Sequence, residues 1–302
     1  MNSDQNRQTD GMSHPLAYCM ITITVFLWAV GVVIARAVHE EIPLIGLSFW
    51  RWLLAGFLLL PFVGGELLQK LDSVRRHLRL LTIQGILIVG SGALLFYALN
   101  YTTVINATLV NATQPVITVS LAWIFLGDRL RPAQLAGILS AILGVGIMVT
   151  RADWQVVMTM GLNPGDLLVI LAIIGYAFYA VNIRRMPRDL STFASLSVIL
   201  IVGSLFLLPF YLAETVLIKP MSFDLLTVGM VFVLAIIVSI LAMGMWNYAN
   251  HIVGPTRAAV FVNLLPVYGS ILAILFLGEH LYLYHLLGAL LVCSGIFLVV
   301  RK

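Results

Sequence analysis

Long apolar segments occupy most of this sequence, and they constrain its fold more than any other feature. A helix needs about 20 mainly apolar residues to cross a hydrocarbon core about 30 Å thick. The sequence predicts ten such spans, at residues 16–38, 44–64, 79–100, 104–126, 132–150, 165–183, 191–212, 226–249, 257–277 and 282–300. Only short loops remain between them, so any functional site is expected inside a helical bundle.

The composition excludes most soluble classes of protein. Of the 302 residues, 61% are hydrophobic and 10% are charged, whereas soluble domains carry about 25% charged residues. A soluble enzyme, a disordered protein and a nucleic-acid-binding partner are therefore not expected, and the surrounding medium is a lipid bilayer. Cys19 and Cys293 lie in apolar segments and are expected to be buried thiols. No sequence pattern indicates a disulfide, a bound metal or a cofactor.

The basic residues predict how the chain is oriented. The tails and even-numbered loops hold thirteen of them: Arg7, Lys70, Arg75, Arg76, Arg79, Arg129, Arg131, Arg184, Arg185, Arg188, Arg257, Arg301 and Lys302. The opposite side holds Arg36, Arg151 and Lys219. This bias predicts that both termini are cytoplasmic. The acidic residues are expected in loops, tails or first helical turns, because an ionised carboxylate is costly in the bilayer centre.

The two halves of the chain carry the same pattern at a constant separation of 151 residues. The segment from Pro115 to Phe125-Leu126-Gly127-Asp128 matches the segment from Pro266 to Phe276-Leu277-Gly278-Glu279. A single gap-free offset indicates an internal duplication. It divides the chain into a cytoplasmic tail (1–15), a first five-helix repeat (16–150), a linker (151–164) and a second repeat (165–300). The match also argues that the first span is retained and is not a cleaved signal peptide.

Five spans per repeat is an odd number, so the second repeat must enter the membrane in the opposite direction. Inverted repeats of this kind are typical of secondary transporters, with the substrate site near the midplane between the halves. The predicted fold is all-α and integral to the membrane, with ten helices in two inverted five-helix repeats.

These features resemble the drug/metabolite transporter superfamily of the EamA type. The resemblance covers residues 16 to 300 and depends on the two five-span repeats, on the proline-centred fourth helix of each, and on the run from Arg51 to Ala55. It implies a ten-helix basket with a central cavity in a bacterial inner membrane. It also implies export of small metabolites, with amino acids, aromatic and other neutral ones, as the main expectation.

Candidate substrate-binding residues are uncharged side chains within the spans. Amides inside a membrane need a hydrogen-bond partner, which is either another helix or a substrate. The strongest candidates are Asn111 and Gln114, three residues apart and next to Pro115; Asn182 and Asn263 are further ones. Aromatic rings could stack on a substrate or attract its ammonium group, or only pack in the core. The aromatic candidates are Trp28, Tyr97, Tyr101, Phe178, Tyr179, Trp246 and Tyr248. Pro115 and Pro266 are candidate hinges, or static bends.

Arg51 is the one full charge well inside a span. It is expected to snorkel outward or to pair with Glu40 or Glu41, and otherwise to hold a substrate carboxylate. The neighbouring Phe49, Trp50 and Trp52 suit an interfacial aromatic belt. The pairs Gly127-Asp128 and Gly278-Glu279 are interpreted as helix ends, and the Ala136, Ser140 and Gly144 face of span five as a packing surface.

A cavity of amides and aromatic rings without a buried carboxylate favours a neutral or zwitterionic solute. Proton coupling is expected to be weak or absent, because only His285 comes near a span. The sequence contains no cluster of catalytic or metal-binding spacing, so an enzyme is not expected, and a channel is a minor alternative. The main alternative is a broad drug or metabolite exporter, or a nucleotide-sugar-type carrier, of the same fold. The pattern is compatible with a monomer.

Overall fold

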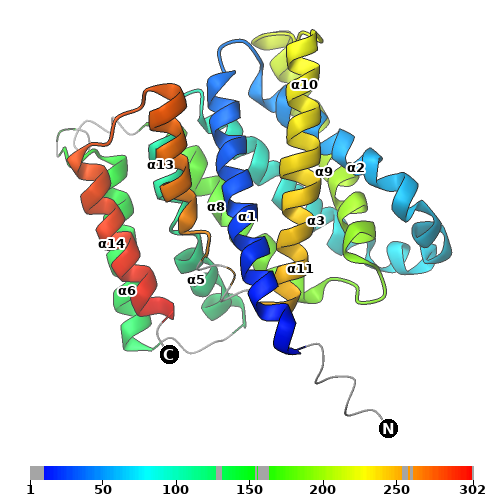
Figure 1. Cartoon of the computed structure of the whole chain (residues 1–302), viewed down its shortest axis with the longest axis horizontal. Coiled ribbons are helices and arrows are strands. Elements are labelled where there is room, and N and C mark those ends of the chain that lie inside the picture. The colour runs from blue at the N-terminus through cyan, green and yellow to red at the C-terminus, as the bar shows by residue number, and fades with distance from the viewer. Residues whose placement is uncertain are drawn as a thin grey trace.

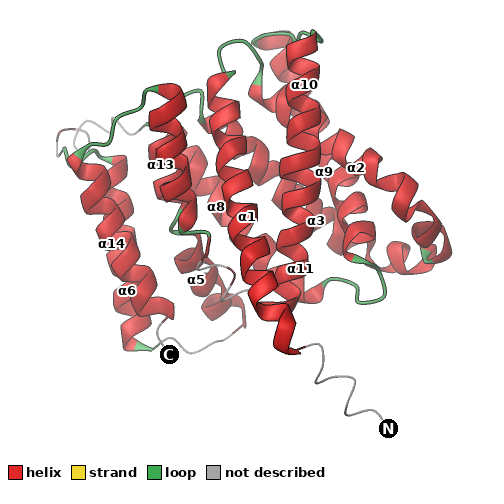
Figure 2. Cartoon of the chain, viewed as in Figure 1, coloured by secondary structure: helices red, strands yellow, loops and turns green. Residues whose placement is uncertain are grey.

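The computed structural model describes residues 10–126, 131–153, 155, 163–253, 258 and 261–300, and most of these residues are helical (Figure 2). The helices are α1 (Asp10–Ala37), α2 (Leu44–Gln69), α3 (Leu71–Ala98), α4 (Val104–Asn111), α5 (Gln114–Leu126), α6 (Pro132–Val149), α8 (Pro164–Asn182), the 3-10 helix η1 (Ile183–Arg185), α9 (Thr192–Leu217), α10 (Leu225–Val233), the π-helix η2 (Leu234–Ala242), α11 (Met243–Val253), α13 (Leu264–Leu277) and α14 (Leu283–Val300). No strand occurs within these ranges.

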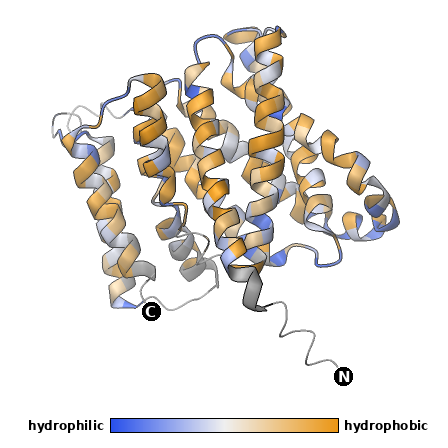
Figure 3. Cartoon of the chain, in the orientation of Figure 1, coloured by the Kyte–Doolittle hydropathy of each residue, from blue (hydrophilic) through white to orange (hydrophobic). Residues whose placement is uncertain are grey.

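The helices form a bundle, and most of their residues are hydrophobic (Figure 3). Within the described residues, six spans are long and apolar enough to cross a membrane, and shorter apolar helices accompany them. Large side chains such as Phe62 and Leu225 point outward, with 85% and 92% of their surface exposed. Such a surface suits lipid and not water, so this is an all-α, multi-pass membrane protein. Cys19 and Cys293 also lie on the exposed surface, so the expectation that both thiols are buried was wrong.

The two repeats run in opposite directions through the bundle. The end of α1 lies at the end of α3, because Arg36 donates a hydrogen bond to the carbonyl of Leu99. The start of α8 lies at the same place, because Asn163 Nδ2 donates to the carbonyl oxygen of Tyr101 at 2.7 Å. Hence α1 ends where α8, its repeat mate, begins. Figure 1 shows that α1 begins and α14 ends at one face of the bundle, called here the terminal face.

The helices α6 and α14 are repeat mates and pack closely against each other. Ser140 Oγ donates to the carbonyl of Leu291, 151 residues away, at 2.9 Å. A Cβ on Gly144 would lie 2.7 Å from the carbonyl oxygen of Gly288, so only glycine allows this approach. The predicted small-residue packing surface is therefore confirmed for Ser140 and Gly144, whereas Ala136 is exposed.

The helices α2 and α9 are also repeat mates, and each ends in a glutamate that caps the start of the other. Glu66 accepts hydrogen bonds from the backbone N–H and hydroxyl of Ser191 at 2.8 and 2.6 Å. Glu214 accepts from the N–H groups of Ile45 and Gly46 at 3.1 and 2.7 Å. Capping satisfies N–H groups that a helix start leaves unpaired. Glu214 was expected in a loop, but α9 continues past it and buries it, because these two N–H groups compensate its charge.

The fourth predicted span is two helices and not one bent helix. The helix α4 ends at Asn111 and α5 begins at Gln114, with Ala112 and Thr113 in a turn between them. Pro115 is the second residue of α5, a position where a helix needs no backbone N–H. The proline therefore starts a new helix, and the expected continuous span over 104–126 was wrong. Pro266 has a similar place, third in α13, after a turn at residues 262 and 263.

The eighth predicted span contains a nine-residue π-helix, η2, between α10 and α11. The pattern of apolar residues did not predict it. Such segments are rare, short and common at functional sites. Gly278 ends α13 in the left-handed region with φ of 65°, which confirms that Gly278-Glu279 marks a helix end. The matching pair Gly127-Asp128 lies outside the described residues.

Candidate functional site

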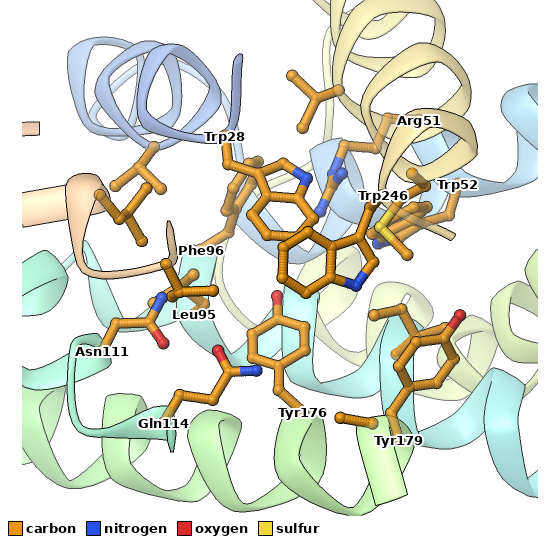
Figure 4. A pocket seen from close by; sticks show the side chains of 17 residues that line it. Trp28, Arg51, Trp52, Leu95, Phe96, Asn111, Gln114, Tyr176, Tyr179 and Trp246 are labelled. Atoms are coloured by element: carbon orange, nitrogen blue, oxygen red, sulfur yellow. The ribbon is translucent and has the colours of Figure 1, made fainter. Parts of the chain in front are cut away.

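A cavity lies between the two repeats in the interior of the bundle, and Figure 4 shows its walls. Its described lining consists of Trp28 and Val32 of α1; Arg51 and Trp52 of α2; Ile88, Leu95 and Phe96 of α3; Asn111 and Gln114 at the α4–α5 break; Tyr176, Tyr179 and Ala180 of α8; Val238 of η2; Met243 and Trp246 of α11; and Val262 and Leu265 at the start of α13. Helices α6, α9 and α14 contribute none of these residues and support the wall from outside.

The lining is built from repeat mates, but their chemistry differs between the halves. Four pairs separated by 151 residues face this cavity: Trp28 and Tyr179, Leu95 and Trp246, Asn111 and Val262, and Gln114 and Leu265. In the last two pairs an amide of the first repeat stands opposite an aliphatic side chain of the second. The duplicated backbone therefore makes a symmetric frame, and the amide groups lie on one side of it.

The amide end of the cavity is formed by the break in the fourth span. Asn111 is the last residue of α4 and Gln114 the first of α5, so they flank the turn and do not share one helical face as the sequence suggested. Asn111 is 5% exposed. Its buried Oδ1 has no hydrogen-bond partner among the described residues. A buried acceptor without a partner is costly, and it is well suited to an N–H donor of a ligand.

Aromatic rings line the middle of the cavity. The rings of Trp28 and Trp246 lie 4.9 Å apart between centroids, and Figure 4 places Tyr176 next to them. Tyr176 and Tyr179 lie three residues apart on α8, hence on the same helical face. Rings in this arrangement can stack on a planar or aliphatic group and attract a cation to their faces.

The opposite end of the cavity carries its charge. Arg51 is 2% exposed, and its guanidinium lies 4.0 Å from the ring centroid of Trp52 and 4.4 Å from that of Phe96. No described carboxylate lies within ion-pair distance of it. The expectation that Arg51 snorkels or pairs with Glu40 or Glu41 was therefore wrong.

The contacts of Arg51 compensate for burial without neutralising the charge. Each cation–π contact contributes about 0.5–2 kcal/mol, and a hydrogen bond to a charged group about 1.5–3 kcal/mol. Desolvation of one ion costs several kcal/mol. The contacts of Arg51 together offset much of this desolvation cost, but they supply no negative charge. Of the described lining residues, only Arg51 has a full charge.

A second, wider cavity opens toward the terminal face and is called here the vestibule. It measures about 670 Å³, against about 80 Å³ for the central cavity. Arg188, Ser191, Asn247 and Asn250 are among its lining residues. Tyr179 lines both cavities, and its hydroxyl donates to Asn247 Oδ1 at 3.4 Å. Tyr179 therefore lies between the vestibule and the central cavity, with Asn247 beside it.

Five of the predicted binding residues line the central cavity: Trp28, Asn111, Gln114, Tyr179 and Trp246. Six others lie outside its described lining: Tyr97, Tyr101, Phe178, Asn182, Tyr248 and Asn263.

Each of the six has another place in the fold. Tyr97 and Tyr101 contact each other at the face opposite the terminal face, with hydroxyl oxygens 3.1 Å apart. Tyr248 is 52% exposed. Asn182 ends α8, where its Oδ1 accepts from Arg185 at 3.4 Å. Phe178 is half-buried on α8. Asn263 lies in the turn before α13, and its Oδ1 has no partner among the described residues.

The sequence did not single out Trp52, Phe96 and Tyr176 as lining residues. Trp52 was assigned to an interfacial belt, but it is 3% exposed and faces the cavity. The pairing of Leu95 with Trp246 could have indicated the lining part of α3, next to Phe96. The spacing of three residues from Tyr179 could have indicated Tyr176.

Two segments of the chain, residues 15–150 and 163–301, match the EamA-like transporter family. The chain belongs to this family. The two matched segments together cover most of the protein. A solved crystal structure shares the fold, with a TM-score of 0.64, 20% identity and coverage of 95% of this chain and 96% of the other.

Several relatives of this EamA-family protein are named as transporters, efflux pumps or exporters. The chain is 27% identical to the uncharacterized transporter YyaM of Bacillus subtilis, covering 82% of this chain and 81% of the relative. It is 26% identical to a probable amino-acid metabolite efflux pump of Escherichia coli (91% and 92%). It is 27% identical to the aromatic amino acid exporter YddG of Salmonella typhimurium (90% and 92%).

Proposed function

We propose that this EamA-family transporter exports amino acids, aromatic and other neutral ones, across a bacterial inner membrane. The observation that carries the proposal is the layout of the central cavity, with an amide end at Asn111 and Gln114 and aromatic walls at Trp28 and Trp246. The unpaired Oδ1 of Asn111 offers an acceptor for a hydrogen-bond donor of the solute, and the rings offer faces for an apolar side chain and an ammonium group. The names of two relatives, an amino-acid metabolite efflux pump and an aromatic amino acid exporter, agree with this substrate class.

Transport is proposed to occur by alternating access. The two repeats run in opposite directions, so an exchange of their conformations converts a cavity open to one face into a cavity open to the other. The vestibule supplies the wide approach from the terminal face, and Tyr179 with Asn247 forms the proposed constriction that must open. The helix breaks beside Pro115 and Pro266 are the proposed hinges, because a chain without continuous helical hydrogen bonds bends more readily.

The test is counterflow in proteoliposomes with a panel of neutral amino acids, drugs and sugar phosphates. Neutral amino acids should exchange, and exchange of drugs or sugar phosphates alone would overturn the proposal. In the variants Asn111→Val and Gln114→Leu each amide is replaced by the residue type of its repeat mate, which keeps similar volume. Both should reduce exchange strongly, whereas Ser120→Ala on α5, whose hydroxyl donates to the Val116 carbonyl within its own helix, serves as the matched control.

Two parts of the proposal have separate tests. Both termini are proposed to be cytoplasmic, so cysteines placed at the terminal face should resist impermeant thiol reagents in intact cells and react in inverted vesicles. Export is proposed to run without strong proton coupling. Exchange that strictly requires a pH gradient would contradict this part and leave the substrate class intact.

A further inference from the structure

The charged end of the central cavity holds hydrogen-bond donors that the protein itself leaves unused. The Nε of Arg51 and the indole Nε1 of Trp52 are both buried without a hydrogen-bond partner among the described residues. Both residues line the cavity. Buried polar groups are nearly always paired, so two unpaired donors from adjacent residues at one cavity wall point to a missing acceptor.

Three helices hold the guanidinium in place. Its Nη1 donates to Ser239 Oγ of the π-helix η2 at 3.1 Å. On the other side lies Gly92 of α3, where a Cβ would be 3.1 Å from Nη2 and 3.1 Å from the Trp52 Nε1. Glycine therefore leaves the space that the guanidinium and the indole edge occupy. The widened turn of η2 and the missing side chain at Gly92 both help to place the guanidinium of Arg51.

The contacts of the guanidinium with the protein are neutral. Trp52 and Phe96 offer ring faces, and Ser239 offers a hydroxyl. Since no described carboxylate is near enough to form an ion pair, a ligand is the natural source of a compensating negative charge. A single guanidinium balances a single charge, and its planar fork fits the two oxygens of a carboxylate.

We propose that Arg51 and Trp52, positioned by Ser239 and Gly92, form a subsite for the carboxylate of the transported solute. This inference rests on the proposed function and deepens it. The carboxylate lies at the Arg51 end, and the rest of the solute extends along the rings of Trp28 and Trp246 toward the Asn111 end. The subsite selects monocarboxylates and disfavours amines or alcohols of the same shape, because these leave the cation unpaired.

The test compares binding of four compounds to the purified protein: L-phenylalanine, 3-phenylpropanoate, L-phenylalaninol and phenethylamine. Binding is measured from the shift in unfolding temperature on titration, so it needs no transport. The first two compounds carry a carboxylate and should bind about tenfold or more tightly than the last two. Trp52→Phe should reduce this preference, and Arg51→Gln should remove it, while Phe57→Leu on the outer surface of α2 should leave it unchanged.

Each outcome decides the proposal. Equal binding of the carboxylates and of phenylalaninol by the wild-type protein overturns the subsite, and so does the absence of binding by every carboxylate. The wild-type and Trp52→Phe measurements decide the question even if Arg51→Gln fails to fold. Carboxylate-selective binding without counterflow supports the subsite and overturns the proposed export. Counterflow without carboxylate selectivity supports the proposed export and overturns the subsite.

Discussion

The short helix α4 carries Asn111 to the cavity, and its start is capped by a residue from the other repeat. Glu279 Oε1 accepts from the N–H of Val104 at 2.8 Å, and Oε2 accepts from the N–H of Ile105 at 2.9 Å. A helix of eight residues has little stability of its own. We therefore expect the carboxylate of Glu279 to control how well α4 is ordered.

The magnitude follows from the two hydrogen bonds. Glu279→Gln keeps the size and one acceptor oxygen, but it loses the charge and one charge-assisted bond, which contributes about 1.5–3 kcal/mol. Partial solvent exposure of the side chain reduces this to about 1–2 kcal/mol. Glu279→Ala loses both bonds and should cost about 2–4 kcal/mol. With a shift of about 2–4 °C per kcal/mol, the unfolding temperature should fall by roughly 2–8 °C for the glutamine variant and more for alanine.

The assay is thermal unfolding of the detergent-purified protein, with Glu41→Gln as the matched control. Glu41 is an exposed glutamate on the same face of the bundle, in the loop before α2. The order of unfolding temperatures should be control, glutamine variant, alanine variant, from highest to lowest. An unfolding temperature of Glu279→Gln equal to that of the control would refute the capping argument.

Three further predictions concern other parts of the bundle. Gly288→Leu should lower the unfolding temperature markedly, because a Cβ there would lie 2.3 Å from Met148 Cγ and 2.8 Å from the Gly144 carbonyl oxygen; Leu290→Ala, at a lipid-facing position, is its control, and equal stability of the two would contradict the packing. Tyr179→Phe removes the hydroxyl that bonds to Asn247, a bond of about 1 kcal/mol, so the initial counterflow rate should rise up to about fivefold, and a rate at or below that of the wild type would argue against a gate. Hydrogen bonds from the backbone N–H and the side chain of Thr227 hold the pKa of Asp224 below its usual value. Its stabilising effect should therefore be present above the usual aspartate pKa and be lost as the pH falls through the lowered one; the unfolding temperatures of wild type and Asp224→Asn should converge in acid, and a constant difference would count against this assignment.

The sequence by itself determined the membrane environment, the duplication and the inverted order of the repeats. These depend on local properties, since apolar length, basic loops and a constant offset of 151 residues can be read along the chain. The offset also identified Trp28 and Tyr179 as a pair, and both face the cavity. The amides of Asn111 and Gln114 were found because a polar group in an apolar span is conspicuous.

The tertiary structure decided which polar and aromatic residues share one space. Trp52 and Trp50 are equally aromatic in sequence, yet only Trp52 faces the cavity, because the direction of a side chain depends on how α2 packs against its neighbours. The break at Ala112 and Thr113 and the π-helix from Leu234 to Ala242 arise from backbone hydrogen bonding that a hydrophobic pattern does not encode. The interpretation of Arg51 changed most. The sequence predicted a snorkelling or loop-paired charge, whereas in the fold its partners come from α3 and η2, far away along the chain.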